Sequence, residues 1–223
     1  MPVVTAVEVQ KRSKERVNIY LDGSYAFSLN IVDAASLRTG QSLSDSEIAA
    51  MRGEDAVVRA VDSAARFLGH RPRSVSEVRR NLKDKEFDAG IIDAAIERLE
   101  RMGYLDDTAF AQYWVENRIQ FKPLGSSALR FELRQKGISD AVIQHALADL
   151  NDQHGARQAA EPLLRRMRGT HRRTAWQKLS TTLARRGFAF EDVRAALDEL
   201  FQDVEADDDT FFAGEDDDTE HEP

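Results

Sequence analysis

The chain has 223 residues, no cysteine and a formal net charge of −8, with 39 acidic residues against 31 Lys and Arg. This length allows one to three small domains with a sizeable core. The lack of cysteine excludes disulfides, thiolate catalysis and thiolate metal sites. The sequence has neither an apolar run long enough to span a bilayer nor a signal-peptide pattern, so we expect a cytoplasmic protein without a membrane partner.

The charge is unevenly distributed along the chain. Residues 203–223 carry eleven acids and no Lys or Arg, whereas the remaining 28 acids face 31 bases. A mildly basic body joined to a strongly acidic tail favours a body that faces nucleic acid, or a tail that interacts with a partner.

Residues 1–30 are predicted to form a small antiparallel sheet. Apolar residues alternate in three runs, 3–9, 17–21 and 25–29, and Asp22-Gly23 between the last two is a strong hairpin signal. The apolar faces match best with a three-residue loop, Asp22-Gly23-Ser24, which places Leu21 opposite Tyr25. A sheet of this size is not stable alone, so we expect it to pack on the helices that follow.

Residues 31–53 are predicted to be a connector with short helical turns, in which Ser44 and Glu47 form a capping box and Gly53 ends the segment. From residue 54 to about 202 the apolar spacing is helical throughout. Ser74 and Glu77 form a second capping box, which starts a new helix after the break at 69–72.

The helical region repeats itself with a period of about fifty residues. The stretch 82–99 overlays 133–150 at an offset of 51, and 183–200 overlays the second copy at an offset of 50. The helix ends at Gly137 and Gly187 in the last two copies, where the first has Glu86. Each copy is preceded by its own predicted helix: 56–69, 107–121 and 155–168.

The sequence therefore predicts a mainly α protein made of three tandem three-helix repeats. Stacking of such repeats would give an elongated, curved body. The expected parts are an N-terminal β segment with its connector, three repeats and a disordered acidic tail, bounded at 1–53, 54–103, 104–151, 152–202 and 203–223.

The stretch 98–111 is predicted to be a rigid joint between the first two repeats. Gly103 suits the left-handed position after a helix, and Asp106 is a good N-cap for the next one. Leu105 and Phe110 then have the spacing of a hydrophobic staple, which would set the angle between the repeats. The alternative, that Asp106 and Asp107 form a metal site or an acid–base pair, has little support, because no His or third acid is near in sequence.

Basic residues gather at the corner after the first helix of each repeat and along the second helix. In the third repeat, residues 154–187 hold nine Lys or Arg against one acid, Glu161, and so dense a charge suggests an anionic partner. The alternative is that these are ordinary solvated helix faces. The candidate filament- or DNA-binding residues are Arg71, Arg73, Arg79, Arg80, Lys83, Lys122, Arg130, Arg134, Lys136, Arg157, Arg165, Arg166, Arg168, Arg172, Arg173, Lys178, Arg185 and Arg186.

The acidic segment 203–223 is predicted to be disordered, because it has too few apolar residues to fold alone. An inert, solvated tail is the simplest interpretation. Two alternatives stay open: Phe211-Phe212 is a docking motif, or the segment folds back on the basic third repeat as a nucleic-acid mimic.

No catalytic constellation is visible, and no metal or cofactor is expected. The five His residues lack metal-ligand spacing, and no phosphate-binding glycine loop or nucleophile motif occurs. Trp114 and Trp176 lie on predicted helices, where core packing is a simpler role than base stacking.

Several motifs resemble the bacterial RecX family. They are Arg73-Ser-Val-Ser-Glu77-Val, then Leu99-Glu-Arg-Met-Gly-Tyr-Leu-Asp-Asp107 with Phe110-Ala111, then Leu133-Arg-Gln-Lys-Gly-Ile138. The resemblance covers roughly 56–200, is looser in the third repeat, and leaves the acidic tail outside the common pattern. It implies a non-enzymatic modulator of the RecA recombinase that binds in the groove of the RecA filament on single-stranded DNA.

Such a modulator inhibits strand exchange, ATP hydrolysis and co-protease activity, and so acts in recombination, DNA repair and the SOS response. The matching motifs are capping and core residues, so the contact candidates rest on charge alone. We expect a monomer that meets single-stranded DNA directly or through the filament. The alternative is a direct nucleic-acid-binding protein that uses its basic third repeat.

Overall fold

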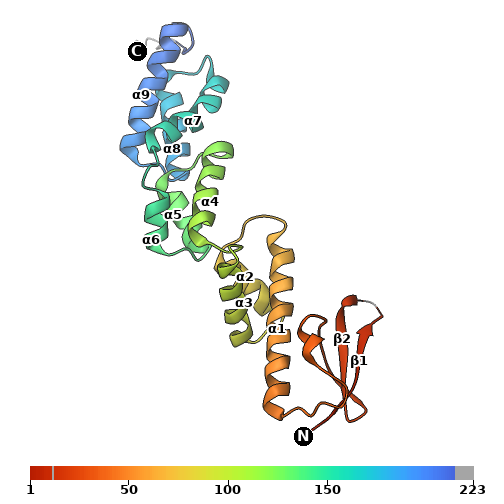
Figure 1. Ribbon diagram of the computed structural model, residues 1–223. Helices are drawn as coiled ribbons and strands as arrows, with labels where there is room; N and C mark the ends of the chain where they lie inside the picture. The colour runs from red at the N-terminus through yellow and green to blue at the C-terminus, as the bar shows by residue number, and fades with distance from the viewer. Residues whose placement is uncertain (12, 214–223) are drawn as a thin grey trace, which may run out of the picture. The chain divides into compact units, whose positions relative to one another are not determined.

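The computed structural model describes residues 1–11 and 13–213, which divide into two compact units at the boundary between Asp106 and Asp107 (Figure 1). The prediction of a mainly α protein with a small antiparallel N-terminal sheet is confirmed. The first unit contains β1 (Val4–Gln10), β2 (Ser13–Leu21), β3 (Ser24–Asn30), α1 (Asp45–Leu68), α2 (Val75–Asp84) and α3 (Ala89–Arg101). The second contains α4 (Asp107–Phe121), α5 (Ser126–Gln135), α6 (Asp140–Ala146), α7 (Asp152–Leu164), α8 (Arg172–Arg185) and α9 (Phe190–Asp207).

The three strands pair antiparallel in the order β1-β2-β3. Their apolar face buries Val17, Ile19 and Phe27 in a core that Ile48 and Met51 of α1 help to close. The sheet therefore packs on a helix, as its small size requires. Within the first unit, α1 lies between the sheet and the α2–α3 pair (Figure 1).

The predicted three-residue hairpin loop was wrong. Leu21 pairs with Ser24, so the turn is the two-residue Asp22-Gly23, with both residues at positive φ (49° and 83°). Two positive φ values are typical of the type I′ turn that suits tightly paired strands. A shift in register between Ile19 and Tyr20 then restores the match of apolar faces, with Ile19 opposite Phe27.

The predicted connector at 31–53 was also partly wrong, because a single helix, α1, runs from Asp45 through Gly53 to Leu68. The capping box of Ser44 and Glu47 is present and starts this helix. Gly53 costs roughly 1 kcal/mol relative to Ala within a helix. The helix continues because both of its halves are buried, the first against the sheet and the second, at Ala60 and Ala64, in the first helical core.

The three-helix repeats are confirmed as α1–α3, α4–α6 and α7–α9, each with its own buried core. The same turn recurs between the second and third helix of each repeat. Glu86, Gly137 and Gly187 all have positive φ (63°, 78° and 83°). The amide after each donates to the carbonyl five residues back, at 3.3, 3.1 and 3.3 Å. This is the Schellman pattern, which needs a left-handed residue.

The joint between the first two repeats has the predicted helix end and helix start. Gly103 has φ +74°, and α4 begins at Asp107, directly after the expected cap. Leu105 is buried in the first helical core and Phe110 in the second, so the two residues of the expected staple belong to different cores. The angle between these repeats, and with it the elongated, curved shape, stays a prediction.

Within the second unit, the second and third repeats meet at two glycines. The Gly125 amide donates to the Arg186 carbonyl at 2.9 Å. A Cβ on Gly125 would lie 2.2 Å from the Gly187 carbonyl oxygen, and one on Gly187 would lie 2.5 Å from the Ala128 nitrogen. The backbones approach so closely that only glycine fits at either position.

The disordered tail was predicted to begin at residue 203, which is too early. Helix α9 continues to Asp207, and Phe211 is buried in the third core. The Gly169 amide donates to the Phe211 carbonyl at 2.8 Å, which ties the segment to the start of α8. Apolar burial and backbone hydrogen bonds offset the conformational entropy that is lost when this acidic segment is ordered, and neither can be seen from its composition. Residues 214–223 lie outside the described part of the chain.

Candidate nucleic-acid interface

In the first repeat, the candidate cations divide into structural and exposed residues. Arg71 bonds the capping-box carboxylate of Glu77 at 2.8 Å. The half-buried Arg73 guanidinium lies 4.0 Å from the Phe67 ring centre, and burial lowers its pKa. Arg79 pairs with Asp93, whereas Arg80 and Lys83 are exposed without an ion pair to any described carboxylate. Only the last two are uncommitted surface charges.

The second repeat shows the same division. Arg134 bonds Asp140 at 2.8 Å, and the Lys136 ammonium lies 4.9 Å from the Trp114 ring. Lys122 and Arg130 are exposed and make no ion pair with a carboxylate in the described ranges.

The third repeat has the most basic sequence, but four of its arginines are paired with acidic residues. The partners come from α7 itself and from α9 and the segment that follows it. The pairs are Arg165 with Glu161 (2.5 Å), Arg157 with Asp203 (2.5 Å), Arg172 with Glu205 (2.7 Å) and Arg168 with Asp208. We call Asp203, Glu205 and Asp208 the masking acids. Three of the paired arginines are therefore neutralised by residues 203–208, so of the alternatives left open for the acidic segment this part of it follows the one in which the segment folds back on the third repeat.

The geometry of these pairs shifts two ionisation equilibria. The hydrogen bond that Arg157 donates to the Asp203 carboxylate raises the pKa of Arg157, which keeps that guanidinium charged. The Thr210 hydroxyl, and after it Arg168, lower the pKa of Asp208. Both pairs are therefore ionised near neutral pH.

Five candidate cations of the third repeat have no ion pair with a carboxylate of residues 1–11 or 13–213. They are Arg166, Arg173, Lys178, Arg185 and Arg186. Arg173 shares a shallow hollow of about 440 Å³ with Arg172, Trp176 and Gln177. Lys178 and Arg185 are seven residues apart on α8, so they share one face of that helix.

Both tryptophan rings pack against a helical core, as predicted. Trp114 packs against the second core, and its Nε1 donates to Glu132 Oε2 at 2.8 Å. Trp176 packs against the third core. The Trp114 ring is therefore no open platform for a base, whereas the half-buried Trp176 ring also lines the hollow that it shares with Arg172 and Arg173.

Sequence reasoning missed a row of arginines on α1. Arg52, Arg59 and Arg66 are spaced by seven residues, so they follow one another along the same face of the helix, about 10.5 Å apart. This spacing is a readable signal, but the predicted break at Gly53 hid it, because the three residues were not expected on one helix.

Two other kinds of site are absent from the described part of the chain. No group of three His, Cys, Asp or Glu side chains is placed to hold a metal ion there. No helix within residues 1–11 and 13–213 is both long and apolar enough to cross a membrane.

Comparison with family models matches the chain in four consecutive stretches. The Regulatory protein RecX N-terminal domain matches residues 2–44. The first, second and third three-helix domains of RecX match 60–99, 106–147 and 152–197.

Individual relatives agree with these matches. The chain is 34% identical to Regulatory protein RecX of Bacillus subtilis (strain 168), over 94% of this chain and 81% of that protein. It is 36% identical to Regulatory protein RecX of Bacillus licheniformis, over 93% and 80%. A crystal structure of regulatory protein RecX superposes with a TM-score of 0.73 at 28% identity, covering 89% of this chain and 100% of the other.

Proposed function

The chain belongs to the RecX family of regulatory proteins, and from this membership we propose that it regulates the RecA recombinase. In this proposal it binds the RecA filament on single-stranded DNA in the cytoplasm and inhibits strand exchange, ATP hydrolysis and co-protease activity. It acts by binding, not by catalysis. The observation that carries the proposal is the match of all four RecX domains in chain order.

The exposed, unpaired cations of the third repeat support contact with a polyanionic filament. Lys178 and Arg185 lie on one face of α8, and neither is paired with a described acid. A phosphate backbone or an acidic protein groove would supply the missing negative charge.

The test is the rate of ATP hydrolysis by RecA on single-stranded DNA, measured as the chain is titrated in. We expect the rate to fall as the chain saturates the filament. Lys178→Glu/Arg185→Glu should leave helix content unchanged and require at least tenfold more protein for the same inhibition. The variant Arg38→Glu/Arg101→Glu is a matched control, because it makes the same change in net charge at exposed positions of the first unit, and it should leave the inhibition unchanged. A wild-type chain that leaves the rate unchanged would refute the proposal.

A second candidate function is direct nucleic-acid binding by the third repeat, favoured by the five unpaired cations there. It predicts that affinity for bare nucleic acid falls steeply with salt and is lost in Lys178→Glu/Arg185→Glu. Salt-insensitive binding, or none, would exclude it.

A further inference from the structure

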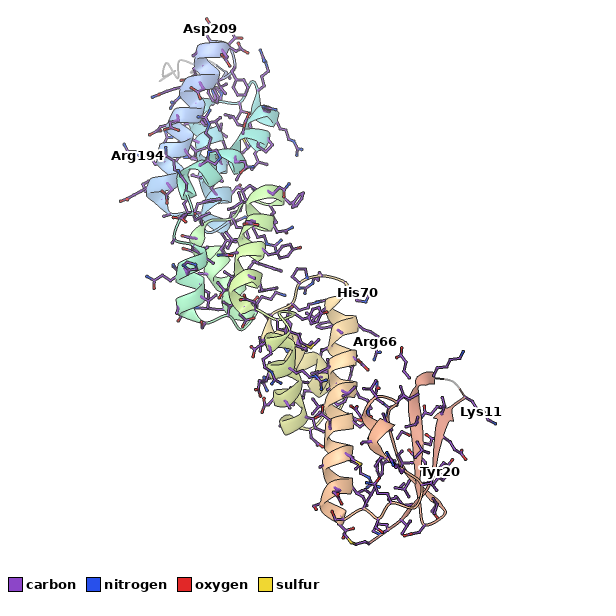
Figure 2. The ribbon with its side chains drawn as sticks, viewed as in Figure 1. Lys11, Tyr20, Arg66, His70, Arg194 and Asp209 are labelled. Carbon is purple, nitrogen blue, oxygen red and sulfur yellow. The ribbon has the colours of Figure 1, made fainter. Side chains whose placement is uncertain are left out.

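The first unit contains a cavity of about 810 Å³ whose lining comes from the sheet, from α1 and from the turn after α2. All of its walls belong to one compact unit. Arg66, near the C-terminal end of α1, contributes to this lining, and Figure 2 labels it. We call this cavity the sheet–helix groove.

Five cations line the groove, and only two carboxylates, Asp55 and Asp62, accompany them. Of these five cations, only Arg16 forms an ion pair with a carboxylate of the described residues. Its Nη2 lies 2.9 Å from Oδ1 of the buried Asp55. The full set is Arg16, Arg52, Arg59, Arg66 and Lys85.

Three of the other four cations are held by groups that leave their charge uncancelled, and the fourth, Arg66, is exposed and has no ion pair with a described carboxylate. Arg52 donates to the Ala26 carbonyl at 2.9 Å and lies over the Phe27 ring. Arg59 lies 5.9 Å from the centre of the Phe87 ring, and Lys85 donates to the Ser63 hydroxyl at 2.6 Å. Rings, carbonyls and hydroxyls orient a cation without neutralising it, so the groove keeps an excess of positive charge.

An aromatic ring stands at the same groove. Tyr25 is 59% exposed, although its hydroxyl is within 3.1 Å of the Ser28 hydroxyl and its ring meets Tyr20 edge-on at 6.1 Å. These contacts fix the position of the ring and leave most of it open to solvent. A fixed, exposed ring beside a row of cations is the arrangement that proteins use to bind single strands, with phosphates on the cations and a base on the ring.

We propose that the sheet–helix groove binds single-stranded nucleic acid, with Arg59 and Arg66 on phosphates and Tyr25 stacked on a base. A single strand is favoured over a duplex because paired, stacked bases offer no free face to Tyr25. This site deepens the proposed function by naming where the chain meets the DNA strand, yet it lies outside all eighteen cations predicted from the sequence. Its test does not require RecA.

The experiment is fluorescence anisotropy of a labelled single-stranded 20-mer and of the same sequence as a duplex, with the full chain and no RecA. Arg59→Gln/Arg66→Gln should bind the single strand at least tenfold more weakly at low salt. The slope of log affinity against log salt should fall by about 1.4, since each lost contact with single-stranded phosphate removes about 0.7. Both arginines are exposed, so the variant should keep its helix content by circular dichroism.

Two further variants keep the result interpretable. Tyr25→Ala should lower affinity about tenfold with an unchanged salt slope, and Tyr25→Phe should restore it. Arg38→Gln/Arg101→Gln removes two exposed charges of the same unit that do not line the groove, and should change affinity less than twofold.

Equal losses in the groove pair and in the control pair would overturn the proposal, since they would indicate diffuse attraction only. So would unchanged affinity in Tyr25→Ala, or a duplex bound as tightly as the single strand. If the groove pair keeps its oligonucleotide affinity and loses inhibition of RecA, the groove binds protein and the proposal is wrong. If the groove pair loses its affinity for the oligonucleotide while the wild type leaves RecA unaffected, the groove proposal is supported and the proposed regulation of RecA is refuted.

Discussion

The sheet–helix groove and the basic surface of the third repeat are built from the same residue types but hold their charges differently. In the third repeat, Arg157, Arg168 and Arg172 each reach a masking acid supplied by α9 or the segment after it. In the groove, Arg52 and Arg59 lie on phenylalanine rings instead. The third repeat is the more basic in sequence, and yet the groove has the larger share of uncancelled charge.

The difference teaches that the density of charge along a chain does not measure the charge that a surface offers. Four of the nine cations at 154–187 are paired, and the partners of three of them lie at 203–208, outside that stretch. The α1 arginines look ordinary because Asp55 and Asp62 lie between them in sequence, although Asp55 is turned to Arg16 on β2. Pairing in space decides which cations can bind a ligand.

The largest expected effect comes from separating the third repeat from the second while leaving the groove intact. Gly125→Ala would place a Cβ 2.2 Å from the Gly187 carbonyl oxygen. Because a backbone atom cannot move aside cheaply, we expect a loss of about 3 kcal/mol in the free energy of unfolding, measured by urea denaturation.

The matched control is Gly53→Ala, at a glycine with open space around it on α1. Here alanine should raise stability by roughly 0.5–1 kcal/mol. Oligonucleotide binding should survive in both variants if the groove carries it. Loss of binding in Gly125→Ala alone would move the principal site to the second unit.

The next effect tests whether the masking acids hide a binding surface. Asp203→Asn/Glu205→Gln/Asp208→Asn frees Arg172 and Arg168 and leaves Arg157 with only the more distant Glu199, at 3.9 Å, so affinity for the single-stranded 20-mer should rise about tenfold at low salt. The salt slope should steepen by about 1.4, for two added phosphate contacts. Because the lost ion pairs are largely exposed, the free energy of unfolding should change little.

The control for this variant neutralises three other exposed acids of the second unit, Glu116, Asp149 and Glu191, and so changes the net charge by the same amount. An equal rise in affinity in both triple variants would mean that long-range charge, not masking, sets the binding.

Much of the fold could be predicted from the sequence, because its signals are local. The capping boxes at Ser44 and Ser74, the left-handed Gly103 and the repeat period depend on residues a few positions apart, and all are present. The hairpin register failed because a shift in pairing within the strand compensated for the shorter turn. The extent of α1 failed because its two halves are buried in different cores, which local spacing does not reveal.

The candidate site could be predicted less well, since contact surfaces depend on residues far apart in the chain. Arg168 and Asp208 are forty positions apart, and Arg16 and Asp55 are thirty-nine. No pattern within one helix indicates either pair. The groove itself needs the sheet, α1 and the turn at Lys85 together, so only the folded unit shows it.

A smaller effect sharpens the comparison between the repeats at one equivalent position. Glu86 holds the left-handed conformation that Gly137 and Gly187 hold in the other two. A residue with a Cβ costs roughly 1–2 kcal/mol there, and the greater freedom of glycine in the unfolded chain offsets about half of the gain. We therefore expect Glu86→Gly to stabilise the chain by about 0.5–1 kcal/mol in thermal unfolding. The reciprocal Gly137→Glu should destabilise it by a similar amount, and two changes of the same sign would contradict this account.

The smallest expected effect is the pH dependence of the masking contact at Asp208. Its pKa is lowered in the folded chain by the Thr210 hydroxyl first and by Arg168 as well. A carboxyl with a lowered folded pKa contributes stability that is present above its unfolded pKa, near 4, and is lost as the pH falls through the folded value. Wild type should therefore melt slightly higher than Asp208→Asn at pH 7, and the gap should narrow as the pH falls below about 4. Asp209→Asn changes the neighbouring exposed carboxyl, which makes no ion pair with a cation of the described residues, and should give no such pH-dependent gap. If the Asp208→Asn gap is as wide at acidic pH as at pH 7, the contact does not depend on the charge of Asp208, and the masking of Arg168 is not electrostatic.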